Sequence, residues 1–461
     1  MLRSAILISL SFAVITAFIL DDYARPKTEH QRRSRTGEDA LYLTPYIQAG
    51  DIKKAQELAV VYPLLKGVES FAGYLTVNKT NFSNLYFWLF KSQLKNWEEQ
   101  PVVIWLQGGP GGSSMFGLFT ELGPFWVNKK LKLKKRKYSW NRKYNLLFID
   151  NPVGAGFSFT NKEEGYVHDE TEVARDLYEF LTQFYSLFPK LQKNKLIITG
   201  ESYAGKYIPA IAYKIYKTNE LSSFKIPLAG LMIGNAFSDP YNLMKYSVYL
   251  YQLGVIDEAT RDKLVEKESI IRAELRAGHW LNAFSEFDEE FDTIVDTTKL
   301  NVYDFVHDDV GFNGFEVQFL NDPKTRKAIH VGDNKFNSGS DTYVHLMTDF
   351  MQSVKPWVEE LLTAEKFPIM YYSGQLDIIV AYPLSVNFYQ KLEWPHAKDY
   401  HVASRCQFKV DNEVAGYYKT AGTFTEVLVR NTGHMVPTTQ PKWAHELLDR
   451  FISNHSSFQC N

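Results

Sequence analysis

The amino-acid sequence predicts an α/β fold in which a central, mostly parallel sheet is flanked by helices and carries an inserted helical cap. Short apolar runs, which are typical of buried strands, alternate with segments that repeat apolar residues at helical spacing. The clearest helical segment is 171–187, where Val173, Leu177, Leu181 and Phe184 keep that spacing. The predicted strands are 85–89, 102–106, 146–149, 196–199, 229–233, 369–373 and 427–429.

One block without strand signal interrupts this alternation. It is charged, and Leu264, Ile271 and Leu275 recur in it among Glu, Lys and Arg residues, as in a helical segment. Because the block lies between predicted strands, we expect it to form a cap subdomain at about 238–311, inserted in a catalytic domain that spans 61–461. A final helix is expected at residues 443–451.

The N-terminus has the pattern of a secretory signal peptide, with Arg3 followed by an apolar run up to Leu20. We expect cleavage of residues 1–20 and no stable membrane span afterwards. The alternative is a retained signal anchor, but the run is shorter than the roughly 20 residues that span a bilayer. Residues 21–60 are interpreted as a leader or pro-segment, because their first part is polar and basic.

Three acceptor sequons for N-glycosylation agree with export through the secretory pathway. They lie at Asn78, Asn81 and Asn454. The expected destinations are the extracellular space and the lysosome, which the sequence does not distinguish.

The composition excludes several classes of protein. The chain has 461 residues, 45% of them hydrophobic, which suffices for a large core. Its formal net charge of -2 produces no overall field towards nucleic acid, so no nucleic-acid partner is expected. Only Cys406 and Cys460 occur, which excludes a multi-cysteine zinc site. No metal or organic cofactor is predicted, and whether the two cysteines pair stays open.

A basic run between Lys129 and Lys137 holds seven cations in nine residues. We interpret it as a solvated hairpin whose edge is protected by lysine. Polyanion binding and dibasic cleavage are the alternatives.

A nucleophile elbow follows the predicted strand 196–199. Residues 200–205 read Gly-Glu-Ser-Tyr-Ala-Gly, which places Ser202 on a tight turn between a strand and a helix. Small residues on both sides let its hydroxyl stand clear of the backbone. The helix that follows contains Pro209, which we expect in its first turn, where proline is tolerated.

A glycine-rich loop follows the predicted strand 102–106, and residues 107–113 read Gln-Gly-Gly-Pro-Gly-Gly-Ser. A phosphate-binding loop is the competing interpretation, but no Lys followed by Ser or Thr closes the run. An oxyanion hole is the better interpretation. One amide would come from this loop and one from the residue after the nucleophile.

A base and its orienting acid are expected later in the chain. Asp377 lies just past the predicted strand 369–373, and His434 lies on a loop past the strand 427–429. Because the ends of parallel strands gather at one edge of a sheet, these side chains can converge on Ser202. His330, in an apolar setting, is the main rival for the base.

With these segments the sequence resembles the serine carboxypeptidase family of α/β hydrolases, and within it the vitellogenic carboxypeptidase-like branch. The resemblance extends over about residues 62–451 and rests on the blocks 105–124, 148–158, 200–210, 374–377 and 433–435. It implies that Ser202 is the nucleophile, His434 the base and Asp377 its partner. It also implies that the amides of Gly109 and Tyr203 form the oxyanion hole.

The resemblance further implies a set of residues that bind the terminal carboxylate of the substrate: Trp105, Gln107, Gly108, Glu121 and Glu201. Two glutamates that face a third carboxylate cannot all be ionised in a closed pocket, so protons must be shared. We therefore expect peptidase activity to be favoured at acid pH.

Three features differ from the family or bear on specificity. Gln107 stands where many members have asparagine, and no cysteine precedes Cys406, although the family usually pins its cap with disulfides. The cap is therefore expected to be looser or held by packing alone. Phe116 and Met435 are expected to line the pocket for the leaving residue, with the bulk of Phe116 restricting it.

The predicted function is that of a serine-type carboxypeptidase, which releases single C-terminal residues from peptides and proteins through an acyl-enzyme. An esterase or acyltransferase on the same triad is the nearest alternative. A protective or binding protein whose triad is unused is the alternative from a different class. The expected partners are peptide or protein C-termini, and a homodimer is left open.

Overall fold

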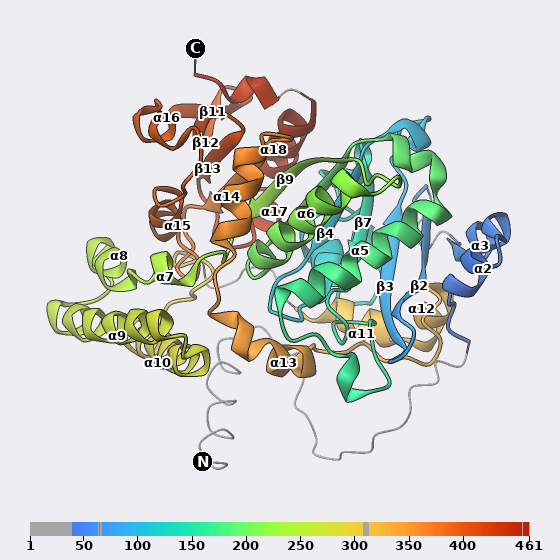
Figure 1. Ribbon diagram of the computed structural model, residues 1–461, viewed down its shortest axis with the longest axis horizontal. Helices are drawn as coiled ribbons and strands as arrows, with labels where there is room; N and C mark the ends of the chain where they lie inside the picture. The colour runs from blue at the N-terminus through green and yellow to red at the C-terminus, as the bar shows by residue number, and fades with distance from the viewer. Residues whose placement is uncertain (1–38, 63, 65–66, 308–312, 454, 461) are drawn as a thin grey trace.

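The computed structural model describes residues 39–460 except 63, 65–66, 308–312 and 454. Its centre is an eleven-stranded sheet in the order β1-β2-β3-β7-β4-β8-β9-β10-β13-β12-β11 (Figure 1). Neighbouring strands from β7 to β13 in this order run parallel, and the pairs at both ends run antiparallel. The strands of the sheet are β1 (Val60–Val61), β2 (Ser70–Asn78), β3 (Ser83–Phe90), β4 (Val102–Leu106), β7 (Asn145–Ile149), β8 (Leu196–Glu201), β9 (Leu228–Gly234), β10 (Ile369–Gly374), β11 (Cys406–Val410), β12 (Glu413–Ala421) and β13 (Phe424–Val429).

This architecture confirms the predicted fold class. Every predicted strand is present, and the strands of this sheet that were not predicted all lie at its ends. Among these, β2 contains Ser, Gly and Thr, which break the apolar run, and β11 alternates between exposed and buried residues with few apolar side chains. An apolar run marks a strand that is buried on both faces, so strands of mixed composition escape that criterion.

The two faces of the sheet contribute to two hydrophobic cores. Successive side chains of a strand point to opposite faces, so Phe87 and Leu89 enter one core while Tyr86 and Trp88 enter the other. Helices α5 and α6 cover the first face (Figure 1). The second face packs against α18 (Pro441–Ser453), the predicted final helix.

Helix α5 (Glu170–Leu187) confirms the predicted helical segment, and α6 (Ala204–Leu221) follows the elbow. Pro209 lies in the second turn of α6, so its expected place in the first turn was wrong. Proline has no N–H to donate to the carbonyl oxygen of Gly205, four residues earlier. The hydroxyl of Ser238 donates to that oxygen at 2.7 Å and replaces the missing backbone bond.

The insertion between β9 and β10 is longer than the expected cap at 238–311. Helices continue to residue 364. The later helices were not predicted because they are short and separated by turns, so no extended periodic pattern indicates them in the sequence. The helices of this region are α7 (Pro240–Leu243), α8 (Tyr246–Leu253), α9 (Glu258–Ala277), α10 (Trp280–Thr298), α11 (Phe315–Asn321), α12 (Pro323–Ala328), α13 (Ser340–Phe350) and α14 (Lys355–Ala364). Figure 1 shows α9 and α10 side by side at the edge of the molecule.

Residues 1–38, which include the predicted signal peptide, lie outside the described residues. The second half of the predicted leader is folded: it contains α2 (Thr44–Gln48), α3 (Ile52–Ala59) and β1, and Leu43, Ala55 and Ala59 are buried in the core. The folded domain therefore begins before the boundary expected at residue 61. Within the described ranges, no helix combines the length and the apolar character needed to cross a membrane.

The basic run lies on a two-stranded hairpin of β5 (Phe125–Val127) and β6 (Leu133–Lys135). All six of its lysines are exposed, whereas Arg136 is half-buried and donates to the carbonyl oxygens of Phe119 and Gly123. The interpretation as a solvated hairpin is therefore confirmed for the lysines.

The structure also places the two cysteines and two of the three sequon asparagines. Cys406 and Cys460 form a disulfide, which resolves the pairing that the sequence left open. Asn78 and Asn81 are half-buried near the turn between β2 and β3, and Asn454 lies outside the described residues. The other helices are α4 (Ser114–Phe116), α15 (Tyr382–Tyr389), α16 (Ala397–Val402), α17 (Val436–Thr439) and the π-helix η2 (Gly117–Leu122). The short 3-10 helices are η1 (Trp97–Glu99), η3 (Trp140–Arg142), η4 (Glu163–Gly165), η5 (Pro189–Lys193) and η6 (His455–Phe458).

Candidate active site

Ser202 lies on the sharp turn between β8 and α6. Its backbone is in the left-handed region with φ +62°, which costs energy for a residue other than glycine and requires support from neighbouring groups. The amide of Ser202 donates to Gly234 O at 3.0 Å, and its carbonyl accepts from the amides of Gly205 and Phe237 at 2.9 and 3.0 Å. Hydrogen bonds therefore hold the elbow to α6 and to the neighbouring strand β9. Ser202 lines a cavity.

The structure brings the predicted acid and base together. Nδ1 of His434 lies 2.8 Å from Oδ2 of Asp377, although the two residues are 57 positions apart. Both side chains are almost completely buried, at 2% and 0% exposure. Nε2 of His434 makes no hydrogen bond within the described part of the chain, and His434 lines the same cavity as Ser202.

The charge state of His434 follows from this environment. Burial lowers its pKa, but the charge and hydrogen bond of Asp377, together with the charge of Glu201, outweigh burial and raise the pKa above 6.5. Asp377 therefore favours an imidazolium, which is the form that a general base reaches after accepting a proton.

Asn235 supports this pair and was not predicted from the sequence. Its Nδ2 donates to Oδ2 of Asp377 at 2.6 Å, and its Oδ1 accepts from the amide of Gly374 at 3.2 Å. It directly follows β9, so the rule that located Asp377 and His434, a polar residue just past a parallel strand, could have found it.

The glycine-rich loop approaches the elbow so closely that side chains are excluded. A Cβ on Gly108 would lie 2.6 Å from the amide nitrogen of Tyr203 and 2.8 Å from Cβ of Ser202. Gly109 follows with φ +122°, a conformation that favours glycine. Gly108, Gly109 and Tyr203 all line the cavity, so the two residues whose amides are expected in an oxyanion hole lie on the same cavity.

A buried carboxyl group supports this loop from behind. Ser113 Oγ donates to Asp150 Oδ1 at 2.5 Å, and the amide of Phe157 donates to Oδ2 at 2.8 Å. Burial raises the pKa of Asp150 to about 7, although these hydrogen bonds oppose the shift. Asp150 is a further residue that the sequence reasoning did not assign to the site.

Gln107 connects the proposed carboxylate-binding residues. Its Oε1 accepts from Trp105 Nε1 at 2.9 Å, and its Nε2 donates to Glu201 Oε1 at 2.8 Å, which fixes the orientation of the amide. Gln107, Gly108 and Glu201 line the cavity. Trp105 and Glu121 are completely buried and are not among the cavity-lining residues, so they lie behind this wall.

Glu121 and Glu201 interact with each other inside the protein. Burial raises the pKa of Glu121 to about 8, while the charge of Arg136 opposes the shift. Burial and the charge of Glu121 raise the pKa of Glu201 well above its usual range. Neither Glu121 oxygen accepts from another described group, which fits a proton shared between the two carboxyls.

The rest of the cavity wall is mainly apolar. Phe237, Phe287 and Phe350 pack on one another with ring centroids 5.1 to 6.1 Å apart. Phe116 and Met435, which were expected at the leaving residue, also line the cavity. Other residues that line the cavity are Tyr303, Glu316, Leu320, Phe336, Tyr343 and Ile379.

The structure does not bring the rival base to this site. Nε2 of His330 lies 3.0 Å from the carbonyl oxygen of Val60, at the edge strand β1. His330 is not among the residues that line the cavity. Its apolar surroundings reflect packing against the edge of the sheet.

Comparisons with known proteins agree with this geometry. The profile of the family described as serine carboxypeptidase matches residues 63–454. The venom serine carboxypeptidase of Apis mellifera is 46% identical, with 90% of this chain and 92% of the relative covered. The probable serine carboxypeptidase CPVL of Homo sapiens is 42% identical, with 89% of each chain covered. The vitellogenic carboxypeptidase of Aedes aegypti is 41% identical, with 91% of each chain covered.

Among solved structures, the chain is similar to KEX1(delta)p, a prohormone-processing carboxypeptidase from Saccharomyces cerevisiae. The TM-score is 0.77 at 26% identity, and 86% of this chain and 96% of that chain are covered. This chain has, besides these similarities, a central parallel sheet, a nucleophile elbow and a buried Asp–His pair. The chain therefore belongs to the serine carboxypeptidase family, and it is a serine-type carboxypeptidase with the α/β-hydrolase fold.

Proposed function

We propose that Ser202, His434 and Asp377 are the catalytic triad of this carboxypeptidase. The observation that carries the proposal is the buried His434–Asp377 contact of 2.8 Å on the cavity that Ser202 also lines. Ser202 Oγ attacks the carbonyl carbon of the last peptide bond while His434 Nε2 takes the hydroxyl proton. Asp377 holds the imidazole with Nδ1 protonated and stabilises the positive charge that forms.

The tetrahedral intermediate carries its negative charge on the former carbonyl oxygen. The amides of Gly109 and Tyr203 are proposed to donate to this oxygen. When the intermediate collapses, the C–N bond breaks and His434 returns the proton to the leaving amine. Water, deprotonated by His434, then hydrolyses the ester between Ser202 and the remaining peptide.

Recognition of the terminal carboxylate is proposed for Gln107, Gly108 and Glu201 on the wall, with Trp105 and Glu121 behind them. A carboxylate cannot approach two ionised glutamates, but a protonated carboxyl donates a hydrogen bond to it. The raised pKa values of Glu121 and Glu201 keep that proton available at acid pH and release it as the pH rises past about 8 for Glu121. This supports a preference for acid over alkaline conditions.

The route through the secretory pathway is also a proposal. It is supported by the signal-peptide pattern at residues 1–20 and by the sequons at Asn78, Asn81 and Asn454. A relative is named a venom carboxypeptidase, which agrees with export of that protein. Mass determination of the secreted protein before and after removal of N-glycans tests this route, and an unprocessed N-terminus without glycans would contradict it.

The activity test compares the wild-type protein with Ser202→Ala on N-blocked dipeptides from about pH 4 to about pH 8. We expect the wild type to release the C-terminal residue and the variant to release none. A fluorophosphonate should label the wild type and not the variant. If neither releases a residue while the wild type hydrolyses a simple ester, an esterase on the same triad is the correct reading. If neither reacts, the triad is unused.

A further inference from the structure

A buried lysine links the nucleophile helix to the cap. Lys206 lies on α6, four residues after Ser202, and its side chain is completely buried. Nζ of Lys206 lies 2.5 Å from Oδ2 of Asp349, which is itself 7% exposed. Nζ also donates to the carbonyl oxygens of Asp349 and Phe350, the latter at 3.4 Å.

These contacts cap the C-terminal end of α13. The last carbonyl groups of a helix have no partner inside the helix and carry partial negative charge, so a cation there is favourable. The hydroxyl of Tyr203 adds a hydrogen bond to Asp349 Oδ2 at 3.3 Å. The residue whose amide is proposed for the oxyanion hole thus also contacts the end of α13.

The charges of this cluster balance. Glu170, at the start of α5, lies beside Lys206 and Asp349, and burial together with the charge of Asp349 raises its pKa well above the usual range. With Glu170 protonated, one ammonium faces one carboxylate. A neutral arrangement of this kind is the form in which buried ionic groups are tolerated.

Helix α13 carries part of the cavity wall. Tyr343 and Phe350 line the cavity, and Phe350 packs against Tyr203 and Phe237 with ring centroids 5.2 and 5.1 Å apart. At the other end of the helix, Thr342 Oγ1 donates to Val153 O at 2.9 Å. The position of α13 therefore decides the shape of the aromatic part of the cavity.

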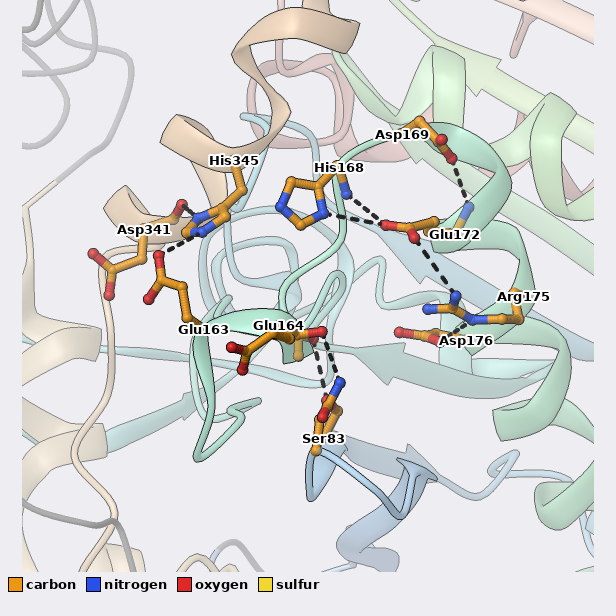
Figure 2. A network of polar contacts seen from close by, with 12 residues as sticks. Ser83, Glu163, Glu164, His168, Asp169, Glu172, Arg175, Asp176, Asp341 and His345 are labelled. Atoms are coloured by element: carbon orange, nitrogen blue, oxygen red, sulfur yellow. Dashed lines mark hydrogen bonds and ion pairs between the residues drawn. The ribbon is translucent and has the colours of Figure 1, made fainter.

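Helix α13 also makes polar contacts near the surface. Figure 2 shows His345 of α13 pointing towards Glu163, with Nε2 of His345 3.0 Å from Oε1 of Glu163. The ring of His345 also stacks on Tyr166 at 4.4 Å. The Glu163 side chain is 62% exposed and that of His345 is 14% exposed, and an ion pair with one partner in solvent contributes little to stability. The chain has no cysteine in its cap, so no disulfide can hold α13.

We propose that Lys206 is a positioning residue, which holds α13 against the nucleophile helix and thereby shapes an aromatic pocket for the penultimate residue of the substrate. The acyl part of the scissile bond belongs to that residue, and its side chain meets the wall formed by Tyr343, Phe350 and Phe237, where the ring of Phe350 packs against the ring of Tyr203. The pocket assignment rests on the proposed roles of Ser202 and Tyr203. The pocket selects large apolar penultimate residues, such as phenylalanine and leucine, over glycine.

The experiment compares kcat and KM for N-blocked dipeptides with phenylalanine or glycine as the penultimate residue and the same leaving residue. Lys206→Met is expected to lower kcat/KM by about 10-fold or more for the phenylalanine substrate, because a misplaced wall weakens binding and alignment. For the glycine substrate the change is expected to be less than about 3-fold, since glycine does not touch the wall. Fluorophosphonate labelling of Ser202 should continue.

Lys206→Met leaves Asp349 as an unpaired buried charge, so a loss of folding must be separated from a loss of positioning. The double variant Lys206→Met/Asp349→Asn removes that charge. It should recover thermal stability and still prefer phenylalanine less than the wild type does. Two single variants serve as controls: Lys214→Met, an exposed lysine on the same helix, and His345→Gln, which breaks the surface contact of α13.

Equal losses for both substrates in the double variant, or an unchanged preference, would overturn the proposal. A wild-type protein without peptidase activity would instead contradict the proposed function. The wild-type assay therefore separates the two failures.

Discussion

Nδ2 of Asn235 donates to Oδ2 of Asp377 at 2.6 Å, the same oxygen that His434 Nδ1 approaches at 2.8 Å. A single carboxylate oxygen therefore receives two hydrogen-bond donors from different loops. This arrangement fixes the carboxylate plane and with it the imidazole, so Asn235 acts on catalysis through Asp377.

The first prediction concerns this contact. Asn235 has φ +39°, so Asn235→Gly removes the amide without straining the backbone. We expect kcat for peptides to fall by about 10-fold to 100-fold with little change in KM, because the base is misaligned while substrate binding is retained. Steady-state kinetics measure this effect. An unchanged kcat would show that Asp377 is held without Asn235.

The second prediction concerns pH. On the alkaline side, above about 8, the pKa of Glu121, the shared proton is lost, peptides with a free carboxylate bind poorly and kcat/KM falls. In Glu121→Gln the side-chain amide donates at every pH, so the decrease in kcat/KM at alkaline pH should be smaller than in the wild type. A substrate with an esterified C-terminus supplies the control, since it needs no shared proton. The same alkaline fall for both substrates would refute the role of the glutamate pair.

The third prediction concerns the leaving residue. Phe116 lines the cavity and lies five residues before Glu121 in the segment behind the carboxylate-binding wall. Phe116→Ala should raise kcat/KM for a tryptophan leaving residue relative to alanine by about 10-fold, because it removes a bulky wall. Competition between two dipeptides that differ only in the leaving residue measures this ratio. An unchanged ratio would place the leaving side chain elsewhere.

The fourth prediction concerns the stability of the cap. Glu290 on α10 is completely buried, and burial together with the charge of Glu268 raises its pKa well above its usual range. Such a group contributes stability that is present below its unfolded pKa and is lost as the pH rises through its folded pKa. In that interval the free energy of unfolding should fall by roughly 1.4 kcal/mol per pH unit.

Glu290→Gln does not titrate, so its advantage in Tm over the wild type should grow between about pH 5 and about pH 7. Asp296→Asn, at an exposed position of the same helix, is the matched control and should show no such trend. A constant difference in Tm between Glu290→Gln and the wild type would contradict the prediction.

The fifth prediction concerns the proline in α6. Ser238→Ala leaves the carbonyl oxygen of Gly205 without its donor, and we expect a loss of about 1 to 3 kcal/mol in the free energy of unfolding. Ser186→Ala is the control, because Ser186 Oγ bonds to Thr182 O within its own helix, where the backbone bond remains. Urea unfolding measures both. Equal losses in the two variants would contradict the replacement of the backbone bond.

Much of this protein was determined by its sequence. Buried parallel strands require continuous apolar runs, so β4, β7 and β8 were visible as such, and the turn chemistry around Ser202 marked the elbow. Asp377 and His434 could be predicted as partners because each lies just past the end of a strand, and the parallel sheet gathers those ends at one edge. These features depend on local composition and on one topological rule.

Only the tertiary structure decided the contacts between distant segments. Lys206 and Asp349 are 143 positions apart, and nothing in either local sequence indicates that the two charges meet inside the protein. The same holds for the disulfide of Cys406 with Cys460 and for the pairing of Glu121 with Glu201. Whether a charge is solvated or buried depends on which elements pack around it, and that packing alone sets its partner and its pKa.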